Sequence, residues 1–538
     1  MQKEEIDNKV MEFVVDGLMP LSIVEKSCFK DMLQALNSQY NPPCSKTLKK
    51  KIELDFEEMK KAMMDEIQQV DALAITHDSW TSVATDNYET VTVQYIHEEE
   101  GKWILKSRVL KTERIEGSHS AEAIADFMKG VKDRWKIKKI TAVSDNASVE
   151  VKCFQKVLKW DWIGCIGHLI NLLVRDVLKG NERVKAIVAK GRQLVSYFKK
   201  SPLATHHFRE KQEALLPDGK RHELCNDVAT RWNSTVDMLV RLLEQSSPLH
   251  AVANDPNLRI KNLKPFLFNA HDQVIVEEVI RILEPFKNMS EKLSASRIPT
   301  LSLVLPSITK LKLVLEKKDL PEDEEDEETL QCYILIEEIK KNISSVIDTR
   351  LKSSAMHETA SILDPVTKGF MVTNFSEEYV TIKLLNLLTE SCRSDNSATS
   401  SADAEEISEP ADKKQKTEGT PSTDYGWLED VLVKNTPVQQ PNASQARLRQ
   451  EIELYLQDGD DAIDVGAMQW WSKKAALYPN IAKLAKTVLC IPASSVESER
   501  IWSLAGNIIT KKRASLLPEN LDMLLFLNHN RKRNDSKM

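Results

Sequence analysis

The chain has 538 residues, of which 29% are charged and 41% are hydrophobic, and its formal net charge is −7 at pH 7. This length is too great for one hydrophobic core, so we expect about two to four domains in a protein of ordinary soluble composition. The lack of a long apolar run and the charged N-terminus exclude a membrane span and a signal peptide, and the acidic balance restricts any DNA-binding surface to a local patch.

Residues 1–70 carry apolar side chains at helical spacing and predict an N-terminal helical domain. The pattern is interrupted at Pro20 and again at the pair Pro42 and Pro43, where we expect a turn. A long charged helix then leads into the next region. Its simplest interpretation is a solvated helix that packs one stripe on the core.

Residues 71–180 contain two segments of the same design, each an apolar, β-branched run that ends in an aspartate. They are ALAITHDSWTS at 72–82, which carries Asp78, and KITAVSDNASVE at 139–150, which carries Asp145. The patterns around them predict the order β-β-β-α-β-α-β-α, a mixed sheet with both aspartates on neighbouring central strands. This is the order of the ribonuclease-H-like fold, although aspartates that only cap the turns after strands are common in α/β domains.

Residues 181–390 are almost entirely helical in pattern and predict an all-α domain, within which a polar stretch from Leu224 to Thr235 carries one tryptophan, Trp232. Residues 391–424 hold almost no apolar side chains, so we expect a disordered linker. The sequence PADKKQKTE inside it is either a weak nuclear signal or a solvated part of the linker.

Residues 425–538 return to a helical pattern and are rich in large apolar side chains. A segment of this size cannot bury all of them alone, so we expect it to pack against the sheet, against a second copy of the chain, or against both. The side chains in question are Trp470, Trp471, Tyr478, Trp502, Leu524, Leu525 and Phe526.

A two-metal site needs a third acidic ligand besides the two aspartates. The best candidate is Glu499, one turn into a helix whose start is marked by Ser494 or Ser495. If this helix packs on the sheet, Glu499 faces Asp78 and Asp145. The alternative is a glutamate that only favours the positive end of the helix dipole, which is common near a helix start.

Five motifs resemble, in order, the signatures of hAT-superfamily transposases, and most nearly those of their BED zinc-finger (ZBED-type) host-protein relatives. They are DSWTS at 78–82, SDNAS at 144–148, CIGHLINLLV at 165–174, DVATRWNST at 227–235 and SSVESERIWSLAG at 494–506. The resemblance covers nearly the whole chain apart from the linker. It implies an α/β fold with large all-α parts, in which a ribonuclease-H-like mixed sheet is interrupted by a helical insertion domain and completed by a helical C-terminal dimerisation region.

The resemblance also implies roles for individual residues. In active members two aspartates and a glutamate bind Mg²⁺ (or Mn²⁺) ions that activate water and then a 3′-hydroxyl for attack on phosphodiesters, and these roles would fall to Asp78, Asp145 and Glu499. Trp232 would stack on a flipped base, and Arg231 beside it would contact a phosphate. Without the resemblance, Trp232 would be a core tryptophan. The apolar side chains of the C-terminal region would form the dimer surface.

BED-type members carry a CxxC…HxxxH zinc finger, and nothing of that spacing occurs in this sequence, which indicates either a truncated gene model or a lost DNA reader. Cys165 and His168 form a CxxH pair, which is only half of a zinc site, so we expect a buried cysteine and a structurally hydrogen-bonded histidine. We therefore expect no structural zinc. The 8 scattered cysteines indicate reduced thiols in the cytosol or nucleus.

The sequence thus predicts a hAT-transposase-derived nuclear protein that homodimerises through its C-terminal region and binds DNA. It predicts no membrane partner and no small-molecule substrate. We do not expect transposition activity from a chain without its DNA reader. Two alternatives remain open: an active cut-and-paste transposase with an Asp-Asp-Glu site, and a dimeric interaction scaffold that does not contact DNA.

Overall fold

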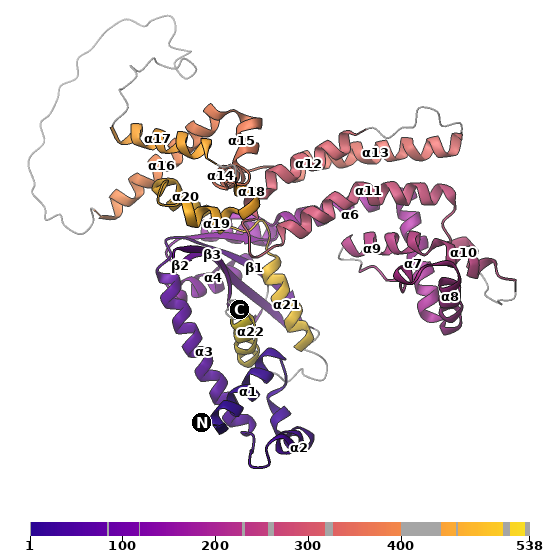
Figure 1. Cartoon of the computed structure of the whole chain (residues 1–538), viewed down its shortest axis with the longest axis horizontal. Helices are drawn as coiled ribbons and strands as arrows, with labels where there is room; N and C mark the ends of the chain where they lie inside the picture. The colour runs from indigo at the N-terminus through magenta and orange to yellow at the C-terminus, as the bar shows by residue number, and fades with distance from the viewer. Residues whose placement is uncertain are drawn as a thin grey trace, which may run out of the picture.

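The computed structural model in Figure 1 has a central β-sheet covered by helices, an N-terminal helical arm, and a long helical domain that extends from one side. The expected disordered linker, 391–424, is helical in its described part, which ends at Thr399; the rest of it, including the basic sequence at 410–418, lies outside the described residues. The structure describes residues 2–82, 85–117, 119–228, 232–256, 263–317, 326–399, 443–458, 461–508 and 517–532.

The sheet has five strands in the order β3-β2-β1-β4-β5. β2 is antiparallel to both β1 and β3, whereas β4 is parallel to β1 and β5 is parallel to β4. The mixed sheet predicted from the alternating patterns is therefore present, with the two aspartate-bearing strands β1 and β4 as neighbours. The strands are β1 (Leu73–Thr81), β2 (Asn87–Glu99), β3 (Lys102–Ile115), β4 (Ile140–Ser144) and β5 (Asp161–Gly164).

Helices make up most of the remaining described chain. Those before and between the strands are α1 (Gln2–Asp16), α2 (Ser27–Leu36), α3 (Ser45–Gln68), α4 (Ala121–Trp135) and α5 (Ser148–Val151), which continues as a π-helical segment (Lys152–Leu158). Those of the insertion are α6 (Ile166–Gly180), α7 (Glu182–Lys200), α8 (Pro202–Leu215), α9 (Trp232–Glu244), α10 (Ser246–Asn254), α11 (Ala270–Leu293), α12 (Val304–Glu316), α13 (Glu327–Arg350), α14 (Ala355–Leu363), α15 (Lys368–Phe375) and α16 (Glu377–Thr399). The C-terminal helices are α17 (Ala443–Gln457), α18 (Ala462–Val465), α19 (Ala467–Lys474), α20 (Pro479–Val488), α21 (Val496–Ile508) and α22 (Pro518–Lys532).

Successive residues of β1 point to opposite faces of the sheet, and each face has its own apolar core. Leu73 and Ile75 point into a core shared with α1, α3, α4 and α22. Ala74 points into the other core, which α14, α17, α19 and α20 complete. The C-terminal region therefore covers both faces of a sheet whose strands all lie in the first third of the chain (Figure 1).

α22 also closes the open edge of the sheet. The Asn530 side chain accepts a hydrogen bond from the Val109 amide and donates one to the Val109 carbonyl, each 3.0 Å long. One turn or more earlier on the same helix, Asp522 accepts from the Thr112 amide at 2.7 Å. Because β3 is an edge strand, these side chains satisfy backbone groups that would otherwise be open to pairing with another chain.

The insertion has a third core, formed by one apolar stripe from each of α6–α9, α11, α12 and α13. Figure 1 shows these helices extending away from the sheet, with α7, α8, α9 and α10 grouped at the far end. Searched over the described residues, no helix has the length and apolar character to cross a membrane.

Candidate functional site

The three acids predicted from the sequence line one cavity, with a volume of about 430 Å³. Asp78 comes from β1, Asp145 directly follows β4, and Glu499 comes from the first turn of α21. The other lining residues are Ser79, Trp80, Thr81, Ser82, His168, Trp502 and Gly506. The structure thus brings together acids from the beginning and the end of the chain.

The register of the sheet explains why the two aspartates are neighbours. β1 and β4 run in parallel, and their last paired residues are Thr76 and Val143. Asp78 and Asp145 each lie two residues beyond this pair, so both side chains project from the same face at the same edge of the sheet. A run of apolar residues that ends in an acid was therefore a sound basis for the prediction.

Several contacts hold the start of α21 against this edge. The hydroxyls of Thr76 and Ser498 lie 2.6 Å apart and are buried. The Ser495 amide donates to the Cys165 thiol at 3.4 Å, and the Ile166 amide donates to the Ala493 carbonyl at 2.9 Å. Because Glu499 follows Ser498 directly, these contacts fix the backbone that carries it.

The cavity concentrates negative charge. Burial and the negative charges of Glu499 and Asp145 raise the pKa of Asp78 to about 8. The neighbouring His77 and Trp502 act in the opposite direction and lower this pKa. Among the described residues that line the cavity, none is a lysine or an arginine. Arg500 is directed elsewhere, since it pairs with Glu497 at 2.6 Å.

The chemistry of this donor set suits a divalent cation, but its ligand atoms are more widely spaced than those of Glu66, His97 and Glu99, the one group among the described residues whose ligand atoms all lie within 4.8 Å of one another. Carboxylate oxygens are the ligands that Mg²⁺ prefers in proteins, and a cation bound among them would relieve the repulsion that raises the pKa of Asp78. Asp145 keeps a fixed orientation because its Oδ1 accepts from the Ala147 amide at 2.9 Å.

His168 is a cavity residue that the sequence did not reveal as such. It lies in the first turn of α6, whose preceding residue, Cys165, is buried and accepts a hydrogen bond from the His168 amide at 3.4 Å. Burial raises the pKa of the Cys165 thiol, which is thus kept protonated inside the protein. The available signal was position: the CxxH pair directly follows β5, so it begins at the same edge of the sheet as the aspartates.

The DNA-contact assignment of Trp232 is not supported by its position, because its side chain is only 4% exposed. Trp232 is the first residue of α9, and its indole belongs to the apolar stripe that continues with Val236 and Leu239. A base cannot stack on this ring in the observed arrangement. Its polar neighbours Asn233 and Ser234 lie in the first turn of the same helix, which is why the motif matched no amphipathic pattern. Arg231 lies outside the described residues.

The side chains assigned to a dimer surface are, with one exception, interior side chains of the single chain. Trp470 and Trp471 are 0% exposed and pack with Tyr455 and Tyr478 in a group that we call the aromatic cluster. Leu524, Leu525 and Phe526 are at most 2% exposed, because α22 packs between the sheet and the N-terminal helices. The exception, Trp502, is half-buried and lines the cavity. Other elements of the single chain already cover these side chains, since apolar patterning shows that a face is covered, and not by what.

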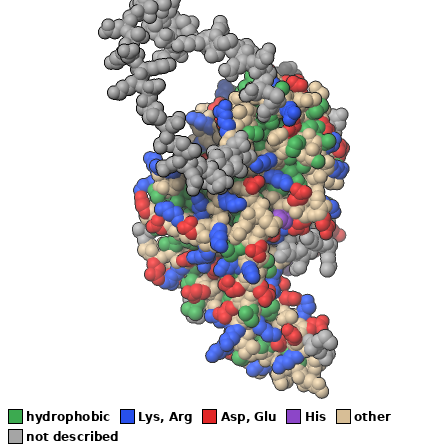
Figure 2. Space-filling model, turned by 90° about the vertical axis from the view of Figure 1, so that its left-hand side faces the viewer, with side chains coloured by type: hydrophobic (Ala, Val, Ile, Leu, Met, Phe, Trp, Pro, Cys, Tyr) green, Lys and Arg blue, Asp and Glu red, His purple; other side chains and the backbone are tan. Residues whose placement is uncertain are grey.

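One outer face of the molecule shows no concentration of a single charge. In Figure 2 lysine and arginine side chains are mixed with aspartate and glutamate over the whole visible face. This mixture agrees with the overall acidic balance of the chain, so this face offers no continuous basic surface for the phosphate backbone of DNA.

Comparison with known families agrees with this architecture. The model of the hAT family C-terminal dimerisation region matches residues 451–531, that of the ZBED1 RNase-like helical domain matches 163–281, and that of the ZBED1 RNase-like domain matches 76–160. The first includes α21, which carries Glu499, and the last runs from within β1 to the residue before β5 and includes both aspartates. The chain belongs to the hAT-transposase family that includes the ZBED proteins.

Individual relatives match almost the entire chain at low identity. Human zinc finger BED domain-containing protein 4 is 23% identical over 98% of this chain and 43% of its own length. The putative AC transposase of Zea mays is 23% identical over 94% of this chain and 62% of its own length. The putative transcriptional regulator tpeD of Talaromyces stipitatus is 22% identical over 96% and 61%. The chain therefore spans about half the length of these relatives.

Proposed function

We propose that this chain is a hAT-transposase-derived nuclear protein that homodimerises, binds DNA, and holds divalent cations with Asp78, Asp145 and Glu499 at the edge of a ribonuclease-H-like sheet. The observation that carries the proposal is the meeting of these three carboxylates in one cavity. The family membership and the names of two relatives, a putative transposase and a putative transcriptional regulator, support the nuclear and DNA-binding parts.

The residues of the chain have distinct tasks in this proposal. Asp78 and Asp145 offer carboxylate oxygens from two adjacent strand ends, and Glu499 offers a third from α21. Bound Mg²⁺ or Mn²⁺ would supply activation of a water or hydroxyl nucleophile and stabilise charge on a phosphodiester. His168 adds an imidazole to the wall of the cavity, and the indoles of Trp80 and Trp502 limit the access of water to it.

Strand cleavage tests the enzymatic form of the proposal. Purified chain is incubated with supercoiled and single-stranded DNA in the presence of Mg²⁺ or Mn²⁺, alongside Asp145→Asn and Glu499→Gln. An active site at this cavity predicts ion-dependent nicking that both substitutions abolish. Glu113→Gln is the matched control, because Glu113 is a 45% exposed carboxylate on β3 outside the cavity. Nicking that survives in Asp145→Asn would place the activity elsewhere.

The dimer contact is best sought among exposed apolar side chains of the matched C-terminal region. Leu454 is 52% exposed and Leu477 is 61% exposed. Their segments are joined, because Glu451 accepts from the amide of Ile481 at 2.9 Å and Asp458 accepts from the Tyr478 hydroxyl at 2.7 Å. We propose that this leucine pair contributes to the contact between two copies.

Light scattering after size-exclusion chromatography tests this contact. The double substitution Leu454→Asp with Leu477→Asp should convert the dimer to a folded monomer, because it places charge in an apolar interface. Leu203→Asp is the matched control: this leucine is also 61% exposed but lies on α8 of the insertion. A wild-type chain that is monomeric at every concentration would contradict homodimerisation itself.

DNA binding is tested by fluorescence anisotropy of a labelled duplex at increasing salt. Contacts to phosphates predict an affinity that falls steeply with salt concentration. A stable dimer with no salt-dependent binding and no nicking would favour the interaction scaffold, which the mixed charges of the face in Figure 2 also fit.

A further inference from the structure

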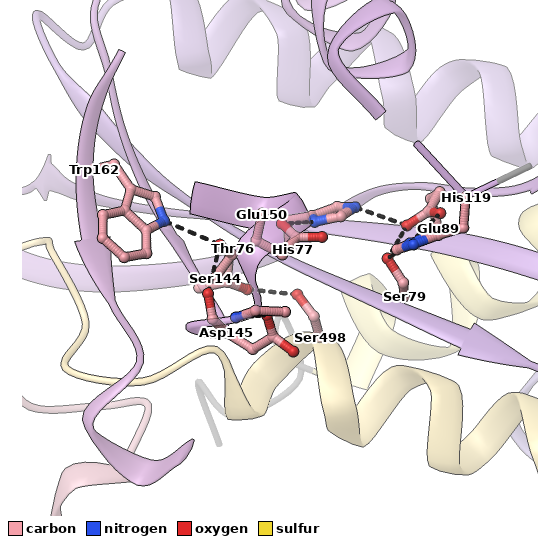
Figure 3. A network of polar contacts seen from close by, with 11 residues as sticks. Thr76, His77, Ser79, Glu89, His119, Ser144, Asp145, Glu150, Trp162 and Ser498 are labelled. Atoms are coloured by element: carbon pink, nitrogen blue, oxygen red, sulfur yellow. Dashed lines mark hydrogen bonds and ion pairs between the residues drawn. The ribbon is translucent and has the colours of Figure 1, made fainter. Parts of the chain in front are cut away.

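A buried histidine, His77, directly precedes Asp78 on β1, and because successive strand residues alternate, it faces the other side of the sheet. Figure 3 shows its ring between Glu89 and Glu150. The His77 side chain is 0% exposed, its Nε2 lies 2.8 Å from Oε2 of Glu89 on β2, and its Nδ1 lies 3.0 Å from Oε2 of Glu150 on α5. Each ring nitrogen thus faces a carboxylate oxygen at hydrogen-bond distance, so the ring links the side chains of Glu89 and Glu150.

The Glu89 end of this link is itself fixed. The Ser79 hydroxyl donates to Glu89, and His119 Nε2 lies 2.8 Å from the Ser79 hydroxyl. His119 comes from the loop before α4 and lies partly at the surface (Figure 3). Since Glu89 cannot move freely, the orientation of the His77 ring is set from the β2 side, and its other nitrogen is aimed at Glu150.

The His77–Glu150 contact crosses a gap in the sheet. The β1–β4 ladder ends at Thr76 and Val143, so no backbone pair joins the two strands where they deliver their aspartates to the cavity. Two side-chain contacts of the described structure lie at this point. On one face of the sheet, His77 contacts Glu150 and so joins β1 to α5, the helix that follows Asp145. On the other face, the Thr76 hydroxyl contacts the Ser498 hydroxyl and so joins β1 to α21, the helix that carries Glu499.

We propose that His77 is a positioning residue, which sets the separation of Asp78 and Asp145 by tying β1 to α5 beyond the end of the β1–β4 ladder. This inference rests on the proposed function, since it concerns the cation site of the same cavity. The two aspartates repel each other, and a repulsion between strand ends widens their separation unless another contact opposes it. The His77–Glu150 contact opposes this widening from the other face of the sheet.

Stability alone is a weak explanation for this buried ionic group. Taking charges out of water costs about as much as their attraction returns, and apolar replacements of a whole buried group are often neutral or stabilising. By contrast, groups that orient metal ligands from behind affect ion affinity by roughly 10- to 100-fold when they are removed. The two explanations therefore predict different results at one position, Glu150.

Ion affinity of the full-length chain tests the proposal. Tb³⁺ is titrated and its luminescence, sensitised by the indoles of Trp80 and Trp502 in the cavity wall, is followed and then displaced with Mg²⁺. Glu150→Met keeps the volume but removes the acceptor, and we expect about 10- to 100-fold weaker binding of both ions. Glu150→Gln keeps an acceptor for His77 and should stay within about threefold of wild type.

Two further variants separate the outcomes. His77→Gln should weaken binding as Glu150→Met does, and it serves as the test if Glu150→Met does not fold. Tyr455→Phe is the stability control, because it deletes a buried hydrogen bond of 2.8 Å to the Ile362 carbonyl in the aromatic cluster, away from the cavity, and should leave ion affinity unchanged. Folding of each variant is verified by circular dichroism.

One outcome would overturn the positioning role and leave the cation site intact. In it, folded Glu150→Met or His77→Gln binds the ions with wild-type affinity, whereas Asp78→Asn loses the sensitised emission. Emission that is identical in wild type and Asp78→Asn would overturn the cation site and the positioning role together. Equal weakening in Glu150→Gln and Glu150→Met would also overturn the proposal, since the acceptor would then be irrelevant.

Discussion

The three-carboxylate cavity and the aromatic cluster are both made where the C-terminal helices meet the sheet, yet they are opposite in character. The cavity gathers like charges and raises the pKa of Asp78 to about 8. The aromatic cluster packs its rings with centroids 5.1–6.0 Å apart and holds the Lys368 ammonium 4.2 Å from the Tyr455 ring centroid. Forming the cavity costs free energy of folding, whereas packing the aromatic cluster contributes it, as is usual when stability is traded against a polar site.

The largest effect is expected from Trp471→Ala in the aromatic cluster. Trp471 stacks on Trp103 at 5.4 Å, and its indole donates to the Leu363 carbonyl at 3.1 Å. Removal of this ring should lower the free energy of unfolding by about 3–5 kcal/mol, as measured by chemical denaturation. Leu203→Ala, at a 61% exposed position on α8, should cost less than about 0.5 kcal/mol. Equal losses in the two variants would mean that the cluster is not a principal source of stability.

A charge introduced on α14, the helix whose Leu363 carbonyl accepts the hydrogen bond from Trp471, should act next most strongly. His357 on α14 is 3% exposed, and burial lowers its pKa to about 4. A lowered folded-state pKa gives stability that is complete above the unfolded pKa of about 6.5 and is lost as the pH falls toward 4. The wild type should therefore lose about 2 kcal/mol between pH 7 and pH 5 relative to His357→Gln, which cannot take up a proton. Parallel pH profiles of the two proteins would contradict a buried neutral imidazole.

In the cavity, by contrast, a substitution should raise the free energy of unfolding. Asp78→Asn removes one of three repelling carboxylates, so in ion-free buffer it should raise the free energy of unfolding by about 0.5–2 kcal/mol. Saturating Mg²⁺ should then stabilise the wild type and not the variant, because only the wild type keeps the full set of ligands. Asp161→Asn, at an exposed position on β5, is the control and should change neither value. A destabilised Asp78→Asn in ion-free buffer would show that the cavity carries no net repulsion.

The smallest effect is expected from Lys486, at the solvent-exposed side of Trp103, the ring that stacks on the aromatic cluster. Lys486 pairs with Glu98 at 2.7 Å and lies 4.9 Å from the Trp103 ring centroid, but its side chain is 38% exposed. Because water screens such a pair, Lys486→Ala should lower the free energy of unfolding by only about 0.5 kcal/mol or less, and Lys486→Arg should restore it. A loss of several kcal/mol would mean that the stability of this region depends on surface charge and not on its buried rings.

The same comparison shows what the sequence could predict. Period-2 alternation and strand-end acids predicted the sheet and the proximity of Asp78 and Asp145, because parallel strands deliver their ends to one edge. The position of Glu499 was predictable only on the condition that its helix packs there. The side chains of the aromatic cluster were recognised as needing cover, but hydrophobicity does not distinguish a neighbouring element from a second copy of the chain.

Two further residues show the limits of local pattern. Trp232 was assigned to DNA by its motif, and only the start of α9 at that residue reveals its place in a core. His77 was overlooked beside Asp78, although an ionisable residue at an inward position of an apolar strand is a signal of a buried partner. The partners themselves, Glu89 and Glu150, were not predictable, because they come from a neighbouring strand and from a helix at the far side of β4.

The contact of Thr76 with Ser498 joins positions 422 residues apart, and this separation sets an order of assembly during synthesis. At about 5–20 residues per second, the strands leave the ribosome roughly 20–80 seconds before α21. Throughout that interval the nascent sheet has two of its three acids, an uncovered apolar face and an open β3 edge. The third carboxylate thus arrives only together with the helices whose packing offsets its cost. A chain terminated before α21 would be an aggregation-prone sheet that lacks Glu499.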